Sequence, residues 1–589
     1  MTRLSTDELL AKIRRRENLT ASEQTSLVIR LSVPAVLAEI STILMEYIDA
    51  AMVGHLGAQA SAAVSVVMPT LWLFWGMAGA VCMGFSVQAA HRIGADDLAG
   101  ARSVLRQALV TALGVATAAL FLGVSVSRYV PVWLGAAPEV CPDASAYFGI
   151  FALGQPFMIL LFLAGGMLRS AGDMKTPSVM NVALCFMDVV FNWFFIFPVR
   201  DVTVFGLTFS VWGAGLGVEG AAWGTFAAQA AAASVLLWQL CARSPLLKIT
   251  HEKGRFMPTR ECLKRAVTIG LPVGVERFFM CSAQIVLTMI VAPLGTVALA
   301  AHGLATSAES LCYMPGYGVS EAATTMVGQS LGAGRKDLAR RMAWLATAIG
   351  VGVMTLMGAV MYFEAPLLMQ WLSSDAGVVA AGSEVLRIEA FAEPLFAASI
   401  VAYGAFVGAG DTLVPCLMNL GSMWAVRLSL AFYLAPLYGL KGVWIAMAAE
   451  LSLRGSLFLL RLRGRRWMQR MPTASAAERR EIVFDVAVTD AVCFGVRSAV
   501  NHAFFGDRTE AVFGRGAFRG IFEVSVLRRY ALRAVFDFEN PTGVRDFVGD
   551  HHIEFADSKL QFESALSPGK SFDGLKKNDF FHEATSDFR

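Results

Sequence analysis

The segment Gly172-Asp173-Met174-Lys175-Thr176-Pro177-Ser178-Val179-Met180-Asn181 returns 238 residues later as Gly410-Asp411-Thr412-Leu413-Val414-Pro415-Cys416-Leu417-Met418-Asn419. The two segments share Gly, Asp, Pro and Asn in one register. Further identical pairs lie at the same offset: Pro34/Pro272, Gly57/Gly295, Ala62/Ala300, Ala63/Ala301, Gly94/Gly332, Arg102/Arg340, Trp133/Trp371 and Pro156/Pro394. A shared composition would match scattered Ala or Gly, but not Trp, Pro, Asp and Asn over about 150 positions. The sequence therefore predicts an internal duplication.

The composition indicates a membrane protein. Of the 589 residues, 56% are hydrophobic and only 16% are charged, whereas soluble domains are about 25% charged. The charges are concentrated in residues 471–589, which carry 18 acidic and 15 basic side chains, so that the first 470 residues are only about 13% charged. The net charge of +3 excludes a nucleic-acid-binding protein. We expect a polytopic membrane body with a soluble appendage.

Twelve apolar segments are long enough to cross a bilayer, which takes about 20 residues in a helix. Each copy of the repeat holds six, an even number, so both copies cross the membrane in the same sense. The fold class is therefore all-α, with two six-helix lobes related by a pseudo-two-fold axis along the membrane normal. The predicted spans are 27–53, 62–90, 104–129, 146–168, 177–198, 215–241, 266–293, 299–328, 342–365, 384–407, 415–436 and 440–460.

The basic residues of the short loops predict the orientation. They collect on the side that also holds the basic run from Arg461 to Arg470, so we expect both termini to be cytoplasmic and the protein to lie in the inner (plasma) membrane. The expected divisions are a cytoplasmic N-terminal segment (1–26), an N-lobe (27–243), a cytoplasmic linker (244–265), a C-lobe (266–460) and a cytoplasmic tail of unknown fold (461–589).

Two predicted spans of the first lobe carry polar groups that are costly in a membrane and usually functional. Glu39, Glu46 and Asp49 lie within about 80° on one face of the first helix, and Asp188 and Asn192 share a face of the fifth. The residues 238 positions after Asp49, Asp188 and Asn192 are Leu287, Val426 and Leu430. The scaffold thus does not require the acids, and we expect an acidic cluster in the first lobe that the second lacks.

Other polar residues in the spans have simpler interpretations. Glu39, Glu219, Glu309 and Glu321, taken singly, could equally reach the membrane interface or bond to a neighbour. His302 is interpreted as a packing or interfacial residue. Glu276 is a secondary candidate that Arg277 could neutralise. No metal-binding Cys/His motif and no HExxH or GxSxG motif occurs, so we expect no metal, no other cofactor and no enzyme.

Several motifs, in their order and spacing, resemble the multidrug and toxic compound extrusion (MATE) family over about residues 25–465. They are Pro34 with Tyr47-Ile48-Asp49-Ala50-Ala51-Met52-Val53-Gly54, then Gly94-Ala95 with Ala101-Arg102, Leu168-Arg169-Ser170-Ala171-Gly172-Asp173-Met174-Lys175-Thr176-Pro177, and Val327-Gly328-Gln329-Ser330-Leu331-Gly332-Ala333-Gly334. The resemblance implies export of organic cations or other amphipathic compounds in exchange for inward H⁺ or Na⁺.

The resemblance also implies roles for individual residues. The ion-coupling site would use Asp49, the polar pair Asp188 and Asn192, and Thr225, with Asp188 as an extra carboxylate. Pro34 falls where the first span of similar transporters bends. The carboxylate that some members carry on the seventh span falls on Met280, which argues against a second-lobe cation site of that type.

Two questions stay open at the level of sequence. Two carboxylates in one water-poor pocket favour a shared proton, but the same oxygens with Asn192 and Thr225 could coordinate Na⁺. A lipid-linked oligosaccharide flippase of the same superfamily is the alternative function. It would need cavity-facing basic residues for pyrophosphate, and the acids here outnumber Arg277, Arg427 and Arg454. The expected partners are small organic cations and the lipid bilayer, with no nucleic acid, and the protein is expected to be a monomer.

Overall fold

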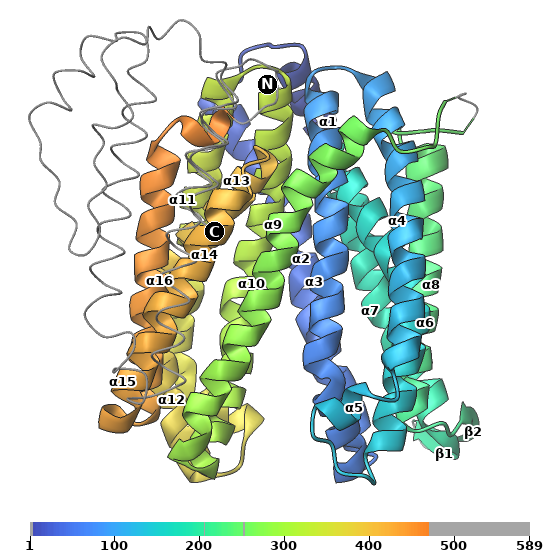
Figure 1. Cartoon of the computed structure of the whole chain (residues 1–589), viewed down its shortest axis with the longest axis vertical. Coiled ribbons are helices and arrows are strands. Elements are labelled where there is room, and N and C mark those ends of the chain that lie inside the picture. The colour runs from blue at the N-terminus through green and yellow to red at the C-terminus, as the bar shows by residue number, and fades with distance from the viewer. Residues whose placement is uncertain (1–3, 205–206, 251–253, 470–589) are drawn as a thin grey trace, which may run out of the picture. The chain divides into compact units, whose positions relative to one another are not determined.

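The computed structural model describes residues 4–204, 207–250 and 254–469 (Figure 1). Contacts divide the chain into two units, Met1–Gly506 and Asp507–Arg589. Everything below concerns the described residues of the first unit. Residues 470–589, which hold most of the predicted tail, lie outside the described residues.

The first lobe is formed by helices that begin at α2, shown in blue to teal in Figure 1. Its spans are confirmed. Helix α4 ends three residues and α7 two residues before the predicted limit, and α8 begins three residues after its predicted start. A short helix, α1, precedes them. The elements are α1 (Thr6–Arg14), α2 (Ala21–Gly54), α3 (Ala58–Gly94), α4 (Leu98–Val126), α5 (Val130–Trp133), α6 (Cys141–Ser170), α7 (Lys175–Ile196) and α8 (Val218–Trp238), which continues as a π-helical turn, Gln239–Arg243.

A β-hairpin joins α7 to α8 and occupies the stretch where the repeat register breaks. Strands β1 (Pro198–Val204) and β2 (Leu207–Ala214) are antiparallel. Their pairing runs from Pro198 opposite Ala214 to Val204 opposite Leu207, with one irregularity next to Arg200. The hairpin and α5 lie at the end of the bundle opposite α1 (Figure 1).

The second lobe repeats the arrangement in green to orange (Figure 1). Its tenth span is broken, because α12 and α13 meet at 61°. The elements are α9 (Arg260–Val291) with the 3₁₀ turn Ala292–Leu294, α10 (Thr296–Gly332), α11 (Lys336–Leu372), α12 (Ala376–Ala390), α13 (Glu393–Gly408), α14 (Leu413–Gly421), the π-helical turn Ser422–Arg427, α15 (Leu428–Tyr438), α16 (Leu440–Arg463) and the 3₁₀ turn Arg466–Met468.

The structure confirms the all-α two-lobe layout of twelve spans. Ten of the described helical segments are long and apolar enough to cross a membrane, and the bent pair α12–α13 forms an eleventh span. Helix α10 is the twelfth, with 37 residues. It packs against α2, α11 and α13, and a helix enclosed by protein can carry more polar residues than one facing lipid.

The internal duplication is visible in the backbone. Helices α3 and α10 begin and end at residues 238 positions apart. Their N-terminal caps, Gly57 and Gly295, have φ angles of 110° and 106°. Gly172 and Gly410, which follow the ends of α6 and α13, have φ angles of 93° and 78°. Because side chains rarely adopt positive φ, each copy needs glycine at both places.

The two lobes are joined at the end of the bundle where α3 and α10 finish. The Nε2 atom of Gln329 donates to the Ser170 carbonyl at 2.8 Å, and the Nε2 atom of His91 donates to the Gly408 carbonyl at 2.8 Å. A Cβ at Gly94 would overlap the backbone of Gln329. These contacts hold the ends of α3 and α10 against the opposite lobe.

Helix α1 covers the same end. Its Ser5 cap and Glu8 form a reciprocal capping box, and the Glu8 pKa is lowered because the Ser5 backbone N–H donates to the carboxylate. The side chains of Leu9, Leu10 and Ile13 are buried in a cluster that includes residues of both lobes. The segment 1–26, which was expected only to be cytoplasmic, thus contains a helix packed across the lobe boundary, and α2 begins within it.

The transmembrane body extends past its predicted limit at residue 460. Helix α16 runs to Arg463, and the turn that follows places Trp467 in the core with no exposed surface. The Trp467 indole packs against Phe406 with 5.5 Å between ring centroids and donates to the Gly464 carbonyl at 3.0 Å. The predicted tail boundary is therefore too early, because an aromatic residue behind a basic run folds back onto the lobe.

We expect Trp467→Ala to destabilise the protein by about 3–5 kcal/mol, since it removes a fully buried aromatic side chain. A stop codon after Arg470 keeps this residue and should leave stability unchanged. Thermal unfolding in detergent compares the two variants. A truncated protein that unfolds at the same low temperature as Trp467→Ala would contradict this interpretation.

Candidate functional site

The predicted polar residues of the first lobe converge between α2, α7 and α8. Asp49 lies on α2, Asp188 and Asn192 lie one turn apart on α7, and Thr225 lies on α8. The Asn192 Nδ2 atom donates to Asp49 Oδ1 at 2.9 Å and to Asp188 Oδ2 at 3.1 Å. Asp188 has no exposed surface, and Asn192 is 1% exposed. The structure thus brings all four predicted ion-coupling residues together.

The packing of α8 on α7 completes this site. A Cβ at Gly224 would overlap the Asn192 side chain, so glycine lets the two helices approach closely. The next residue, Thr225, donates its hydroxyl to the Ala221 carbonyl at 3.2 Å and lies beside Asp188. The carboxyl groups of Asp49 and Asp188 lie beside each other, because both accept a hydrogen bond from the same Asn192 amide. Such proximity is repulsive between two carboxylates and favourable when they share a proton.

Sequence reasoning missed one neighbour of this acidic pair. Tyr147 on α6 lies close enough to Asp49 and Asp188 to sense the charge of both. Its partner at the 238-residue offset is Val385, an apolar residue. The comparison of repeat partners that singled out Asp49 would therefore also have found Tyr147.

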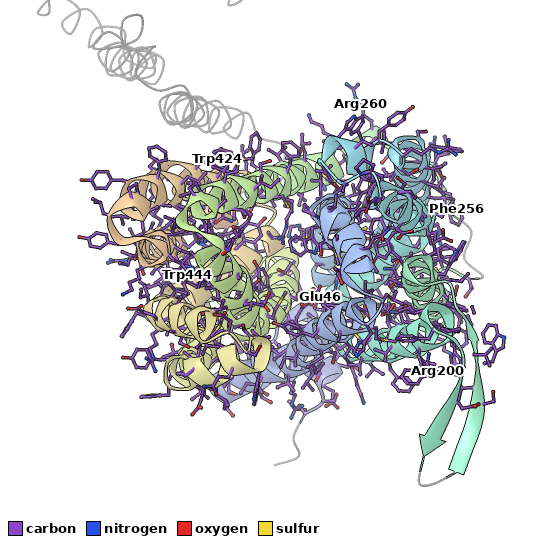
Figure 2. The ribbon with its side chains drawn as sticks, turned by 90° about the horizontal axis from the view of Figure 1, so that it is seen from below. Glu46, Arg200, Phe256, Arg260, Trp424 and Trp444 are labelled. Carbon is purple, nitrogen blue, oxygen red and sulfur yellow. The ribbon has the colours of Figure 1, made fainter. Side chains whose placement is uncertain are left out.

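The other candidates on α2 lie outside this acidic pair. Glu46 is exposed next to Asp49 and lies near the middle of the bundle when it is viewed from the α5 end (Figure 2). Glu39 lies beside an ion pair between Arg169 and Glu321, with 3.4 Å between the charged atoms, which connects α6 to α10. Of these three acids on α2, only Asp49 accepts a hydrogen bond from a described residue of α7.

The structure also places the three other singled-out residues, Pro34, His302 and Glu276. Pro34 lies inside α2, which continues through it as one helix, so the bend there stays a prediction. His302 is buried and accepts a hydrogen bond from the Trp444 indole at 3.2 Å, which confirms a packing role. Glu276 is buried and accepts hydrogen bonds from the Tyr403 hydroxyl at 2.8 Å and from Asn419 Nδ2 at 2.7 Å.

The prediction that the second lobe lacks an acidic cluster is wrong. Glu450 on α16 is completely buried between two arginines, with Arg427 Nη2 at 2.7 Å and Arg454 Nε at 3.0 Å from its carboxylate oxygens. Glu309, Glu389 and Glu393 surround this triad and are also buried. We call the six residues the second-lobe charge cluster: Glu309, Arg427, Glu389, Glu393, Glu450 and Arg454.

The helices that supply the second-lobe charge cluster explain why it was missed. Its residues come from α10, α12, α13, α16 and the turn before α15, and none lies at the repeat partners of Asp49, Asp188 or Asn192. Neither Glu389 nor Glu393 has a carboxylate oxygen that accepts a hydrogen bond from another described residue, and the Cys312 thiol lies beside Glu393.

Among the residues that the structure describes, no group of three or more His, Cys, Asp or Glu side chains is placed to hold a metal ion.

Comparison with known proteins agrees with this architecture. A family model described as MatE matches twice, over residues 34–194 and 272–433, so that its two matches begin 238 residues apart. A "Probable multidrug resistance protein NorM" from Thermotoga maritima is 26% identical over 454 residues, which cover 75% of this chain and 93% of that protein. The "Multidrug resistance protein MdtK" of Yersinia pestis is 25% identical over 460 residues, covering 76% and 96%. A solved structure described as the outward-facing conformation of a multidrug resistance MATE family transporter has a TM-score of 0.70 at 21% identity and covers 79% of this chain and 98% of that one.

Proposed function

Because the chain belongs to the MatE family of multidrug and toxic compound extrusion transporters, we propose that it is a secondary active antiporter that exports organic cations or other amphipathic drugs in exchange for inward H⁺ or Na⁺. Members of this family are transporters and not enzymes. The names of the relatives support drug-like cargo. The acidic residues of both lobes, which outnumber the basic ones inside the spans, support cationic cargo.

The Asn192 amide that bridges the carboxyl groups of Asp49 and Asp188 is the observation that carries the coupling proposal. One shared proton removes the repulsion between the two carboxylates. A bound cation could take the place of that proton, because its positive charge would also offset the two negative charges. The hydrogen bonds of Asn192 favour H⁺ over Na⁺, because the amide turns its donor group toward both carboxylates. A Na⁺ ion at this place would need oxygen ligands, and the amide would have to turn its oxygen inward.

Alternating access requires the contacts at the α1 end to break. The bonds from Gln329 and His91 across the lobe boundary, and the Arg169–Glu321 ion pair, each join one lobe to the other. We propose that release of the proton from the Asp49–Asp188 pair and the opening of this end alternate with cargo binding from the cytoplasm. Glu39, which lies beside the ion pair, is placed to sense its separation.

We also propose that both termini are cytoplasmic in the inner membrane. Ala137 in the loop before α6 and Lys336 at the start of α11 are exposed at opposite ends of the bundle. In a cysteine-free background, Ala137→Cys should react with a membrane-impermeant maleimide on intact cells, and Lys336→Cys only after permeabilisation. The reverse pattern would contradict the orientation.

Reconstitution in liposomes tests the function as a whole. One proton moving inward through about 100 mV provides about 2.3 kcal/mol, and one pH unit adds about 1.4 kcal/mol. Together they sustain a cargo gradient of roughly 500-fold. One-for-one exchange for a monovalent cation would be electroneutral, and only about tenfold would remain. Accumulation of ethidium driven by an imposed pH gradient, with the membrane potential varied separately, measures both ion and stoichiometry.

A lipid-linked oligosaccharide flippase is the alternative outcome of the same experiment. Neither a pH gradient nor a Na⁺ gradient would then drive ethidium, and the liposomes would translocate a lipid-linked sugar instead. Ethidium uptake driven by Na⁺ alone would support the antiporter proposal and identify Na⁺, instead of H⁺, as the coupling ion.

A further inference from the structure

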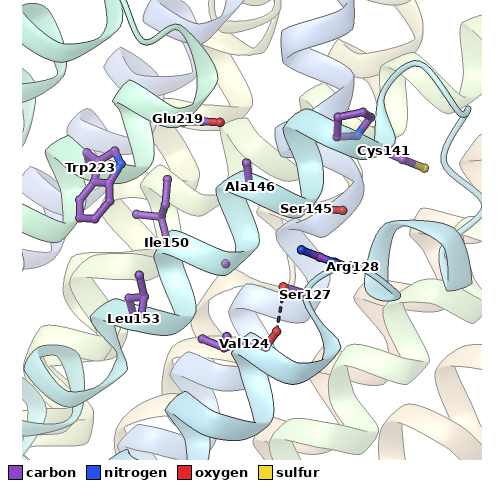
Figure 3. A pocket seen from close by; sticks show the side chains of 12 residues that line it. Val124, Ser127, Arg128, Cys141, Ser145, Ala146, Ile150, Leu153, Glu219 and Trp223 are labelled. Atoms are coloured by element: carbon purple, nitrogen blue, oxygen red, sulfur yellow. Dashed lines mark hydrogen bonds between the residues drawn. The ribbon is translucent and has the colours of Figure 1, made fainter.

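A groove of about 650 Å³ opens on the first lobe at the end of the bundle that holds α5 (Figure 3). The end of α4, the first turns of α6 and the start of α8 form its walls. These three span ends belong to the side predicted to face away from the cytoplasm. The lining includes Arg128, Ser145, Leu153, Glu219 and Trp223.

Two opposite charges line the groove. Arg128 follows α4 and Glu219 begins α8, and in Figure 3 their side chains extend over α6 from its two sides. Both are exposed, and neither makes an ion pair or hydrogen bond with another residue that the structure describes. Ser145 of α6 adds a hydroxyl between them. The groove therefore offers one positive and one negative group to a ligand that carries both charges.

The rest of the groove is apolar and runs along the membrane normal. Ile150, Leu153 and Trp223 form this part with Val124. Leu153 is twelve residues beyond Cys141 on the same helix, a rise of about 18 Å at 1.5 Å per residue. Half of the hydrocarbon core is about 15 Å thick. The groove thus has the length of a lipid head group followed by the upper part of an acyl chain.

A pair of aromatic residues next to the groove marks the level of the head groups. Tyr129 and Trp133 stack with 5.9 Å between ring centroids, and they are 58% and 69% exposed. Exposed Tyr and Trp collect at the interface between membrane and water. Because Tyr129 directly follows Arg128, the charged end of the groove lies at this interface.

We propose that the groove binds a zwitterionic phospholipid with a primary-amine head group, that is, a phosphatidylethanolamine of the outer leaflet. Arg128 binds the phosphate, since a guanidinium forms paired charge-assisted hydrogen bonds with phosphate oxygens. Glu219 accepts a hydrogen bond from the ammonium group, which has three donors. A choline head group has no such donor, and a glycerol head group has no positive charge. The inference does not depend on the coupling ion or the cargo.

Lipid titration of the purified, delipidated full-length protein tests this proposal. Native mass spectrometry with phosphatidylethanolamine, phosphatidylcholine and phosphatidylglycerol of matched chains measures the affinity of each. We expect the wild-type protein to bind the ethanolamine lipid at least tenfold more tightly than the other two. Arg128→Gln should weaken all three, and Glu219→Gln should remove only the preference for ethanolamine over choline.

The matched controls are Glu139→Gln and Arg387→Gln, which remove exposed charges that the groove does not contain. Both should keep the wild-type preference. Equal binding of the three lipids by the wild-type protein would overturn the proposal. A preference for ethanolamine that survives in Glu219→Gln would overturn it as well.

Discussion

We expect Asp49→Asn to fold and insert normally but to lose ion-driven transport down to the level of liposomes without protein. The substitution keeps the size of the side chain and its hydrogen bonds while removing the group that exchanges the proton. The fold does not need the acid, because the equivalent position in the second lobe is Leu287, which is buried in its core. Ethidium uptake driven by a pH gradient, together with thermal unfolding in detergent, gives the two readouts.

Variants of neighbouring residues make this result specific. Asp188→Asn should show a similar but milder loss, since Asp49 can still carry the proton beside a neutral partner. Glu46→Gln is the matched control, because it removes an exposed acid one turn away on the same helix that is not hydrogen-bonded to Asn192. Leu287→Asp should not rescue Asp49→Asn, since the surrounding residues of the second lobe lack the Asp188 and Asn192 partners. If Asp49→Asn exported cargo uphill at the wild-type rate, Asp49 would not couple ion movement to transport. Glu46 would then be the next candidate for the coupling residue.

The second large effect should come from Glu450. Glu450→Gln leaves Arg427 and Arg454 buried without their shared carboxylate. Removing one partner of a buried ion pair typically costs about 3–5 kcal/mol, because the remaining charge is uncompensated. We therefore expect a marked loss of stability in detergent and a low yield of folded protein.

A triple variant separates the cost of unpaired charge from a specific need for the triad. Replacing all three members by apolar residues of similar volume (Arg427→Met, Glu450→Leu and Arg454→Met) should restore much of the stability, as removal of whole buried ion networks often does. If Glu450→Gln were as stable as the wild-type protein, the triad would not be a tightly paired buried network. If the triple variant were stable but inactive in transport, the triad would serve transport and not the fold.

The sequence carried enough information to predict the two-lobe fold. The Gly57/Gly295 and Gly172/Gly410 pairs mark the same backbone turns in both copies, and such positive-φ positions tolerate little besides glycine. The apolar segments between these turns give the positions of the membrane-spanning helices. The broken tenth span was not predicted, although Pro394 lies in the first turn of α13, because its repeat partner Pro156 lies inside the continuous helix α6.

The candidate site was predictable for the first lobe and not for the second. Asp188 and Asn192 are one turn apart on one helix, so their proximity follows from the sequence, and the repeat showed that the scaffold tolerates apolar residues there. Glu309, Glu389 and Glu450 lie on different helices, and only the packing of those helices brings them together. Comparison of equivalent positions detects an asymmetry at one place, but it does not detect a different cluster built elsewhere in the other lobe.

The most direct test of the central claim measures protons during cargo binding. The claim is that the proton on the Asp49–Asp188 pair and a cationic drug replace each other. Purified protein in weakly buffered detergent solution should release about one proton per molecule when ethidium is added, because cation binding and protonation of the pair are mutually exclusive. Asp49→Asn should bind ethidium with much less proton release. An absence of release from the wild-type protein, or equal release from Asp49→Asn, would contradict the account.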